Sequence, residues 1–167
     1  MHSMSRLLPP VLVATLLLAV LPALAAPKTG DAFPDLSKAA LEGTLPDMKD
    51  KVVLVDFWAS WCGPCRAAFP ALKDIAEKYK DRGVVVLGIS LDEDREDMDR
   101  FVNKLKPGFP IVRDPKGKLA EKLGVQGIPS TFIVGRDGRI ASMHEGYGGD
   151  RTKAEYVATI EKLLAAR

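Results

Sequence analysis

Residues 52–65 read VVLVDFWASWCGPC, and both the fold and the chemistry follow from this stretch. Its first half is a nearly continuous run of β-branched and apolar residues, typical of a strand that is buried on both faces. Its second half holds the only two cysteines of the chain, Cys62 and Cys65, separated by Gly63 and Pro64. We therefore expect a reactive thiol pair directly after a buried strand.

Two other roles for the cysteines are weaker. A structural disulfide across so short a loop contributes only roughly 2 kcal/mol on the chain-entropy model. A closed zinc site needs four ligands, and beside the cysteines the chain offers only His144, since His2 lies at the extreme N-terminus. A reversible dithiol/disulfide couple is the favoured interpretation, with inert or metal-binding cysteines as the alternatives.

The hydrophobic pattern around this stretch predicts a βαβ unit. Residues 52–57 and 84–91 are apolar, β-branched runs, and residues 63–79 between them carry apolar side chains at helical spacing. Strand, helix and strand in this order give two parallel strands. The other expected elements are a lead-in at 26–51 with extended pieces around Phe33 and Leu45, an amphipathic helix with its apolar stripe from Met98 to Leu105, a short strand at 110–112, a short helix at 116–123, a hairpin of 131–134 and 139–143, and a helix at 154–166.

The acid-rich segment 92–100 resembles the start of a calcium loop, but its spacing is wrong. The sixth position from Asp92 is Asp97 rather than glycine, and the twelfth is Asn103 rather than glutamate. Acids at the N-terminal end of an amphipathic helix explain the composition better.

The position of the cysteines assigns them different roles. Cys62 falls at the start of the predicted helix, where free backbone N–H groups and the helix dipole favour a thiolate. Cys65 lies one turn later, inside the helix, and should be the more buried sulfur. We therefore expect Cys62 to be the nucleophile and Cys65 the thiol that resolves the mixed disulfide. Pro64 suits the first helical turn because no backbone donor is needed there.

Residues 1–25 have the pattern of a secretory signal. Arg6 precedes a long apolar run, and Ala23-Leu24-Ala25 supplies small residues where a signal peptidase cleaves. The alternative is an uncleaved anchor formed by residues 7–25, whose length is at the threshold for spanning a bilayer. Prolines within the run weaken a continuous helix, so cleavage is the favoured interpretation. No cysteine follows the run, which excludes a lipid attached to one.

The charge of the chain excludes some partners. Removal of residues 1–25 takes away one base and no acid, so the formal charge falls from +2 to +1. Neither a nucleic-acid footprint nor a polybasic membrane patch is visible. Export places the thiol pair in an oxidising compartment, where an exposed pair does not stay reduced unaided.

Several segments resemble one family. Residues 55–65 are similar to the thioredoxin active-site segment almost residue for residue, and GIPSTF at 127–132 resembles the loop that carries that family's cis-proline. GDAFPD at 30–35, the Phe69-Pro70 pair and FPIVRD at 109–114 resemble the exported TlpA/ResA-like branch. The resemblance covers the chain from about residue 30 to the C-terminus. It implies one thioredoxin-like α/β domain over residues 26–167: a central mixed β-sheet flanked by helices, with an N-terminal extension and an inserted helix after the second core strand.

The resemblance also implies a peptide groove beside the sulfurs. Pro129 would be cis, and the backbone of Ile128 would pair with an extended substrate segment. Trp61 and Gly146 would border the same groove. The alternatives are a packing role for Trp61 and an ordinary trans turn for Pro129.

Asp56 is a lone acid in an apolar strand, which is costly unless the acid is paired or functional. Burial should raise its pKa. In thioredoxins this position is a buried carboxylate that relays the proton of the second cysteine, here Cys65; a hydrogen-bonded structural acid is the alternative. Many TlpA/ResA-like proteins carry a glutamate three residues after that cysteine, where this chain has Ala68. The acid-dependent substrate specialisation of that branch is therefore not carried over.

The resemblance implies a periplasmic thiol–disulfide oxidoreductase without a cofactor. Gly63-Pro64 and Ile128 resemble the reducing thioredoxins, whose couple lies near −270 mV against about −120 mV for a strong exported oxidant. A reductant in this compartment needs a membrane electron donor. Candidate substrates are apocytochrome c thiols, a copper-site assembly protein, or exported proteins in general. The alternatives are a disulfide-forming oxidant or isomerase, and a copper-delivery module using Cys62, Cys65 and His144, although His144 is expected at the surface.

Overall fold

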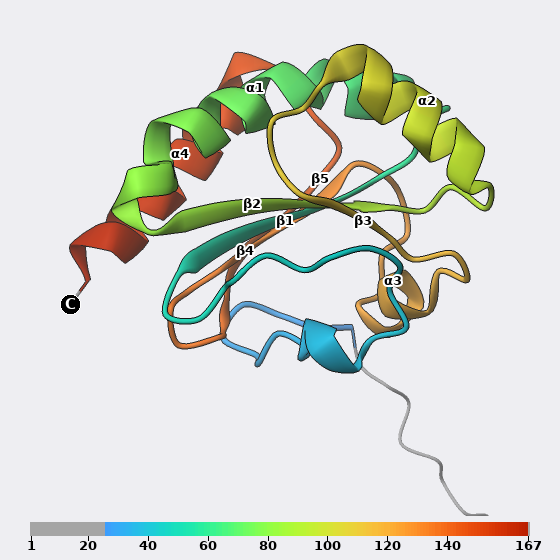
Figure 1. Cartoon of the computed structure of the whole chain (residues 1–167). Coiled ribbons are helices and arrows are strands. Elements are labelled where there is room, and N and C mark those ends of the chain that lie inside the picture. The colour runs from blue at the N-terminus through green and yellow to red at the C-terminus, as the bar shows by residue number, and fades with distance from the viewer. Residues whose placement is uncertain (1–25, 167) are drawn as a thin grey trace, which may run out of the picture.

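A five-stranded mixed sheet forms the centre of the molecule in the computed structural model, which describes residues 26–166 (Figure 1). The strand order is β3-β2-β1-β4-β5; β1, β2 and β3 are parallel, while β4 runs antiparallel to β1 and to β5. The strands are β1 (Val52–Trp58), β2 (Val84–Ser90), β3 (Ile111–Arg113), β4 (Ser130–Val134) and β5 (Ile140–Glu145). The helices are η1 (Leu36–Lys38), α1 (Gly63–Tyr79), η2 (Lys80–Arg82), α2 (Arg95–Leu105), α3 (Lys118–Lys122) and α4 (Asp150–Ala165).

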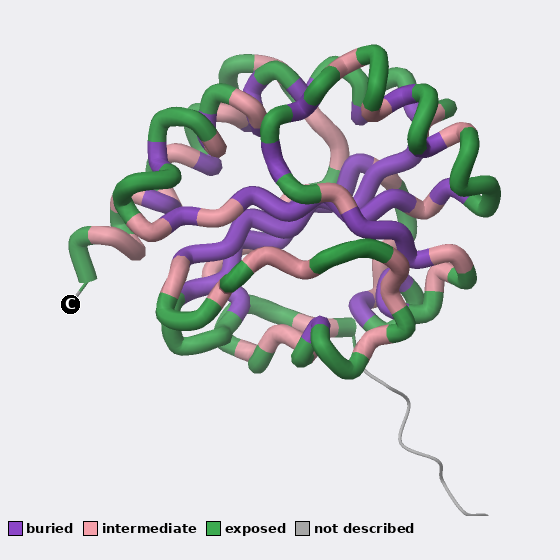
Figure 2. The backbone as a smooth tube through the Cα atoms, viewed as in Figure 1, coloured by how far each residue is buried: buried purple, intermediate pink, exposed green. Residues whose placement is uncertain are grey.

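Helices cover both faces of the sheet. Helices α1, α2 and α4 lie on one face, and the N-terminal lead-in with η1 lies with α3 on the other (Figure 1). The central strands β1, β2 and β4 are almost wholly buried, as Figure 2 shows, whereas only the first residue of the edge strand β5 is buried. All seven residues of β1 are buried and alternate between two apolar clusters: Leu54 and Trp58 face the α1 side, while Val55 and Phe57 face the lead-in side. Asp56 therefore points toward α1.

Aromatic packing holds the inserted helix α2 against the sheet. The Trp58 ring lies 4.9 Å from Phe69 on α1 and 4.8 Å from Phe101 on α2, measured between ring centroids. Phe69 also contacts Phe109, which precedes β3. Pairs at such separations add about 0.5–1.5 kcal/mol each beyond their buried area. The predicted helix after the second core strand is confirmed, and so is the predicted mixed sheet flanked by helices.

Two predicted elements differ from the structure. The lead-in contains the short helix η1, which was not predicted. An extended piece is present next to Phe33, where Ala32 bridges Arg139, but the second bridge joins Glu42 to Arg113 rather than lying at Leu45. Helix α4 begins at Asp150 rather than Ala154. Its first turn is largely polar, so the apolar stripe used for the prediction starts only at Tyr156.

The predicted signal or anchor, residues 1–25, lies outside the described residues. Within residues 26–166, no helix has both the length and the apolar content needed to cross a bilayer.

Candidate active site

The two cysteines form a disulfide at the N-terminus of α1. Cys62 is the N-cap residue, with extended backbone, and its sulfur accepts a hydrogen bond of 3.1 Å from the backbone N–H of Cys65. Pro64 occupies the first turn, as predicted. Cys62 is 5% exposed whereas Cys65 is fully buried. The N–H groups of the helix terminus thus face the more accessible sulfur, where a thiolate would be stabilised.

The loop before β4 lies beside these sulfurs. The Ile128–Pro129 peptide bond is cis, as predicted, and the carbonyl oxygen of Ile128 lies 3.7 Å from the Cys62 Sγ. Gly146 donates its N–H to the Pro129 carbonyl over 2.7 Å and has a φ of +74°, a conformation that favours glycine. Trp61 precedes Cys62 and is 73% exposed. The structure therefore places the backbone of Ile128 beside the Cys62 sulfur and Gly146 beside Pro129.

Asp56 lies in the centre of the sheet, between Gly88 of β2 and Thr131 of β4. The residue is 1% exposed, and this burial raises its pKa from 3.8 to about 7, as predicted in direction. Its Oδ1 accepts a 2.7 Å hydrogen bond from the Thr131 hydroxyl, which opposes that rise. Its Oδ2 is buried and has no hydrogen-bond partner among residues 26–166. A carboxyl group with a pKa near neutrality can both take and release a proton.

Asp92 is buried against the turn that leads to the cysteines, a position that the sequence pattern did not predict. It is 2% exposed, and its carboxylate accepts hydrogen bonds from the backbone N–H and hydroxyl of Ser60, at 2.7–3.1 Å, and from the Ser90 hydroxyl. Ser60 belongs to the turn that leads into Cys62. The sequence signal was available: Asp92 closely follows β2, whose carboxyl end adjoins that of the parallel strand β1.

His144, which was expected at the surface rather than as a metal ligand, is only partly exposed. Its side chain is 19% exposed and packs edge-on against Tyr156, with 5.0 Å between ring centroids. The reason is that β5 places His144 opposite Thr131, on the face covered by α4. Its Nδ1 lies 3.4 Å from Glu155. No cluster of three or more potential metal ligands occurs in the described part of the chain, so His144 does not join the cysteines there.

The sequence matches the family model described as Redoxin over residues 28–160. The chain belongs to this thioredoxin-superfamily family. It is 31% identical, over 137 residues, to the thiol-disulfide oxidoreductase ResA of Bacillus thuringiensis, and the match covers 80% of this chain and 78% of that protein.

Solved structures agree with this assignment. A putative thiol:disulfide interchange protein DsbE from Chlorobium tepidum superposes with a TM-score of 0.76 at 35% identity, covering 83% of this chain and 99% of that one. The thioredoxin domain of a thiol-disulfide oxidoreductase from Bacteroides vulgatus gives a TM-score of 0.69 at 26% identity, covering 81% and 99%. The protein is accordingly a thiol–disulfide oxidoreductase of ResA/DsbE type, with Cys62 and Cys65 as its cysteine pair.

Proposed function

We propose that the protein reduces disulfides of exported proteins. The Cys62 thiolate attacks one sulfur of the substrate disulfide, forms a mixed disulfide and releases the other substrate sulfur as a thiolate. Asp56 takes the proton of the Cys65 thiol. The Cys65 thiolate then attacks the Cys62 sulfur, which closes the Cys62–Cys65 disulfide and releases the second substrate thiolate. The substrate gains two electrons and the cysteine pair loses two.

One observation carries this proposal. The cysteine pair lies at a helix N-terminus, and on the same side of the sheet β1 holds a buried carboxyl group whose pKa is about 7. The helix end favours the thiolate of Cys62, and the carboxyl group suits proton transfer at neutral pH.

The substrate is an extended polypeptide. The backbone of Ile128, whose carbonyl reaches the Cys62 sulfur, supports pairing with a substrate strand. Pro129, Gly146 and the exposed ring of Trp61 form the rest of the groove. Apocytochrome c and copper-site assembly proteins are candidate substrates.

The compartment is the periplasm. Residues 1–25 serve as a signal segment or remain as an anchor, and a donor in the membrane reduces the pair again. Gly63-Pro64 and Ile128, both typical of reducing thioredoxins, support this direction of electron flow.

The test of direction is the equilibrium potential of the Cys62–Cys65 pair, together with its redox state in intact cells. We expect a potential below about −230 mV and a mostly reduced pair. This cutoff lies between the potentials of known reducing and oxidising couples. A mostly oxidised pair near −120 mV would show a disulfide-forming oxidant instead.

The test of substrate is trapping. The Cys65→Ala variant cannot resolve its mixed disulfide and should accumulate Cys62-linked exported proteins. The Cys62→Ala variant is the matched control and should accumulate none.

A further inference from the structure

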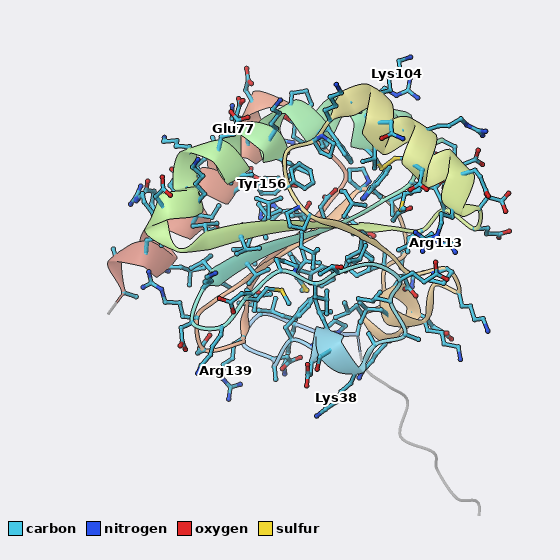
Figure 3. All side chains as sticks on the ribbon, viewed as in Figure 1. Lys38, Glu77, Lys104, Arg113, Arg139 and Tyr156 are labelled. Atoms are coloured by element: carbon cyan, nitrogen blue, oxygen red, sulfur yellow. A yellow bond between two sulfur atoms is a disulfide. The ribbon has the colours of Figure 1, made fainter. Side chains whose placement is uncertain are left out.

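A run of three hydrogen-bonded side chains leads from Asp56 across the sheet to α4. The Thr131 hydroxyl on β4 is 2.7 Å from the Asp56 Oδ1 and 2.7 Å from the Tyr156 hydroxyl. All three residues are at most 1% exposed. Figure 3 shows Tyr156 between the helices and the sheet. Neither Thr131 nor Tyr156 has a role in the exchange reaction described above.

The available protons give these two hydrogen bonds a direction when Asp56 is ionised. An ionised carboxylate only accepts, so the Thr131 hydroxyl must donate its single proton to Oδ1. Thr131 then has no second proton, and the bond to Tyr156 must be donated by the Tyr156 hydroxyl. Burial raises the pKa of Tyr156 above its usual range, so the phenol keeps this proton at any pH where the protein works.

The hydrogen bonds also distinguish the two carboxyl oxygens of Asp56. Oδ1 is occupied by the Thr131 hydroxyl, whereas Oδ2 is buried and unpartnered within residues 26–166. A proton placed on Oδ1 would weaken that oxygen as an acceptor for the Thr131 hydroxyl or, if it were donated to Thr131, would require both hydroxyl bonds to reverse. Oδ2 accepts a proton without any such rearrangement.

We propose that Thr131 and Tyr156 are positioning residues that hold Asp56 through Oδ1 and reserve Oδ2 for the exchange of the Cys65 proton. Tyr156 orients the Thr131 hydroxyl, and that hydroxyl fixes the carboxylate and stabilises its ionised form. The inference rests on the proposed role of Asp56 and names the residues that set its proton affinity.

Other titratable groups lie on this side of the sheet and must be followed in the same experiment. They are Cys65 on α1, His144 on β5, Tyr147 after β5, and Glu155 on α4. Cys65 does not titrate in the disulfide form. The ring signals of His144 report its own protonation separately from the Asp56 carboxyl signal.

The experiment is a titration of the Asp56 carboxyl carbon by NMR in the labelled, oxidised protein between pH 5 and 9. Thr131→Val keeps the shape of the side chain and removes the donor, so the acid dissociation constant of Asp56 should fall about tenfold. Thr131→Ser restores a hydroxyl and should stay within about twofold of the wild type. Tyr156→Phe should lower the constant by a smaller factor, because the Thr131 hydroxyl remains but loses its own donor.

Two results would overturn the inference. One is a Thr131→Val midpoint within about twofold of the wild type. The other is a Thr131→Ser shift as large as that of Thr131→Val, which would assign the effect to packing rather than to the hydroxyl.

The pH profile of mixed-disulfide resolution separates this inference from the proposed function. If Thr131→Val moves the Asp56 titration and leaves the profile in place, the positioning role stands and the proton-transfer role of Asp56 fails. If Asp56→Asn changes the profile and Thr131→Val leaves the titration unmoved, the proposed function stands and the positioning role fails.

Discussion

Asp56 is the one charged residue in β1, and its surroundings determine what it can do. Burial disfavours its ionised form, while a single hydroxyl from Thr131 partly offsets that effect. The resulting pKa of about 7 makes the carboxyl a competent base at neutral pH and, at the same time, a source of instability in the folded state. Both consequences can be measured.

The first prediction concerns activity. Asp56→Asn removes the proposed base, so resolution of the mixed disulfide should slow at least about tenfold at pH 7. In the wild type the rate should rise with pH and level off above about 7, where Asp56 is ionised. In the variant the rate should keep rising as the pH approaches the ordinary thiol pKa of about 8.5, so the difference in rate between variant and wild type should become smaller at alkaline pH. Rapid-mixing kinetics across pH measure both curves, and identical curves would remove Asp56 from the reaction.

The second prediction concerns stability. Between pH 3.8 and about 7, the folded state holds the Asp56 proton and the unfolded state does not. The free energy of unfolding therefore falls as pH rises through this window and then becomes level, with a total loss of roughly 4 kcal/mol from this group. Urea unfolding of the oxidised protein at a series of pH values should show this loss in the wild type relative to Asp56→Asn. A difference that is constant with pH would contradict the raised pKa.

At the scale of elements, the turn between β1 and α1 is held by a neighbouring loop. Asp92, just after β2, binds the backbone and hydroxyl of Ser60, two residues before Cys62. The guanidinium of Arg113 on β3 in turn contacts the backbone carbonyls of Asp92 and Glu93. The carboxyl ends of three parallel strands thus meet at the redox site, as is general for such sheets.

The third prediction follows from this arrangement. Asp92→Ala leaves the Ser60 donors without their acceptor and should lower the free energy of unfolding by about 2–3 kcal/mol. Ser60→Ala removes only the hydroxyl and should cost about 1 kcal/mol. Asp94→Ala is the matched control: Asp94 is exposed and its side chain makes no cap hydrogen bond, so the change should stay within about 0.5 kcal/mol. Equal effects of the Asp92 and Asp94 changes in urea unfolding would contradict the anchoring role.

At the scale of the whole molecule, the redox potential and the stability of the fold are linked. If the Cys62–Cys65 couple is more reducing in the folded protein than in the unfolded chain, the disulfide must stabilise the folded state. Each 30 mV of difference between the two reduction potentials corresponds to about 1.4 kcal/mol of that stabilisation. A strong oxidant has the opposite preference, because its reduced form is the more stable. The packing around the pair, with Cys65 fully buried in the first turn of α1, therefore bears on the direction of electron flow.

The fourth prediction tests that link. If the protein is a reductant, unfolding in urea should require a higher denaturant concentration for the oxidised form than for the reduced form. A Cys62→Ala, Cys65→Ala double variant provides the control, since its midpoint should not respond to reductant. A more stable reduced form would reverse the proposed direction.

The local sequence pattern determined the fold and the centre of the site. Continuous apolar, β-branched runs predicted the two strands of the βαβ unit, and helical hydrophobic spacing predicted its helix and the inserted helix, because burial of apolar side chains imposes these patterns. The cysteine spacing and the acid in β1 predicted a redox pair beside a buried carboxyl group. The boundaries of α4 were less well predicted, since its polar first turn carries no apolar period.

Only the tertiary structure decided which polar side chains meet. Thr131 reaches Asp56 across 75 residues, and Asp92 reaches Ser60 across 32. His144 is half-buried because its side chain lies on the face of β5 that α4 covers, whereas the residues on either side of it in β5 are exposed. Hydrophobic periods indicate which face of an element is buried, but not which hydrogen-bond donor pairs with which acceptor. Strand register and helix placement set those pairings, and they exist only once the chain has folded.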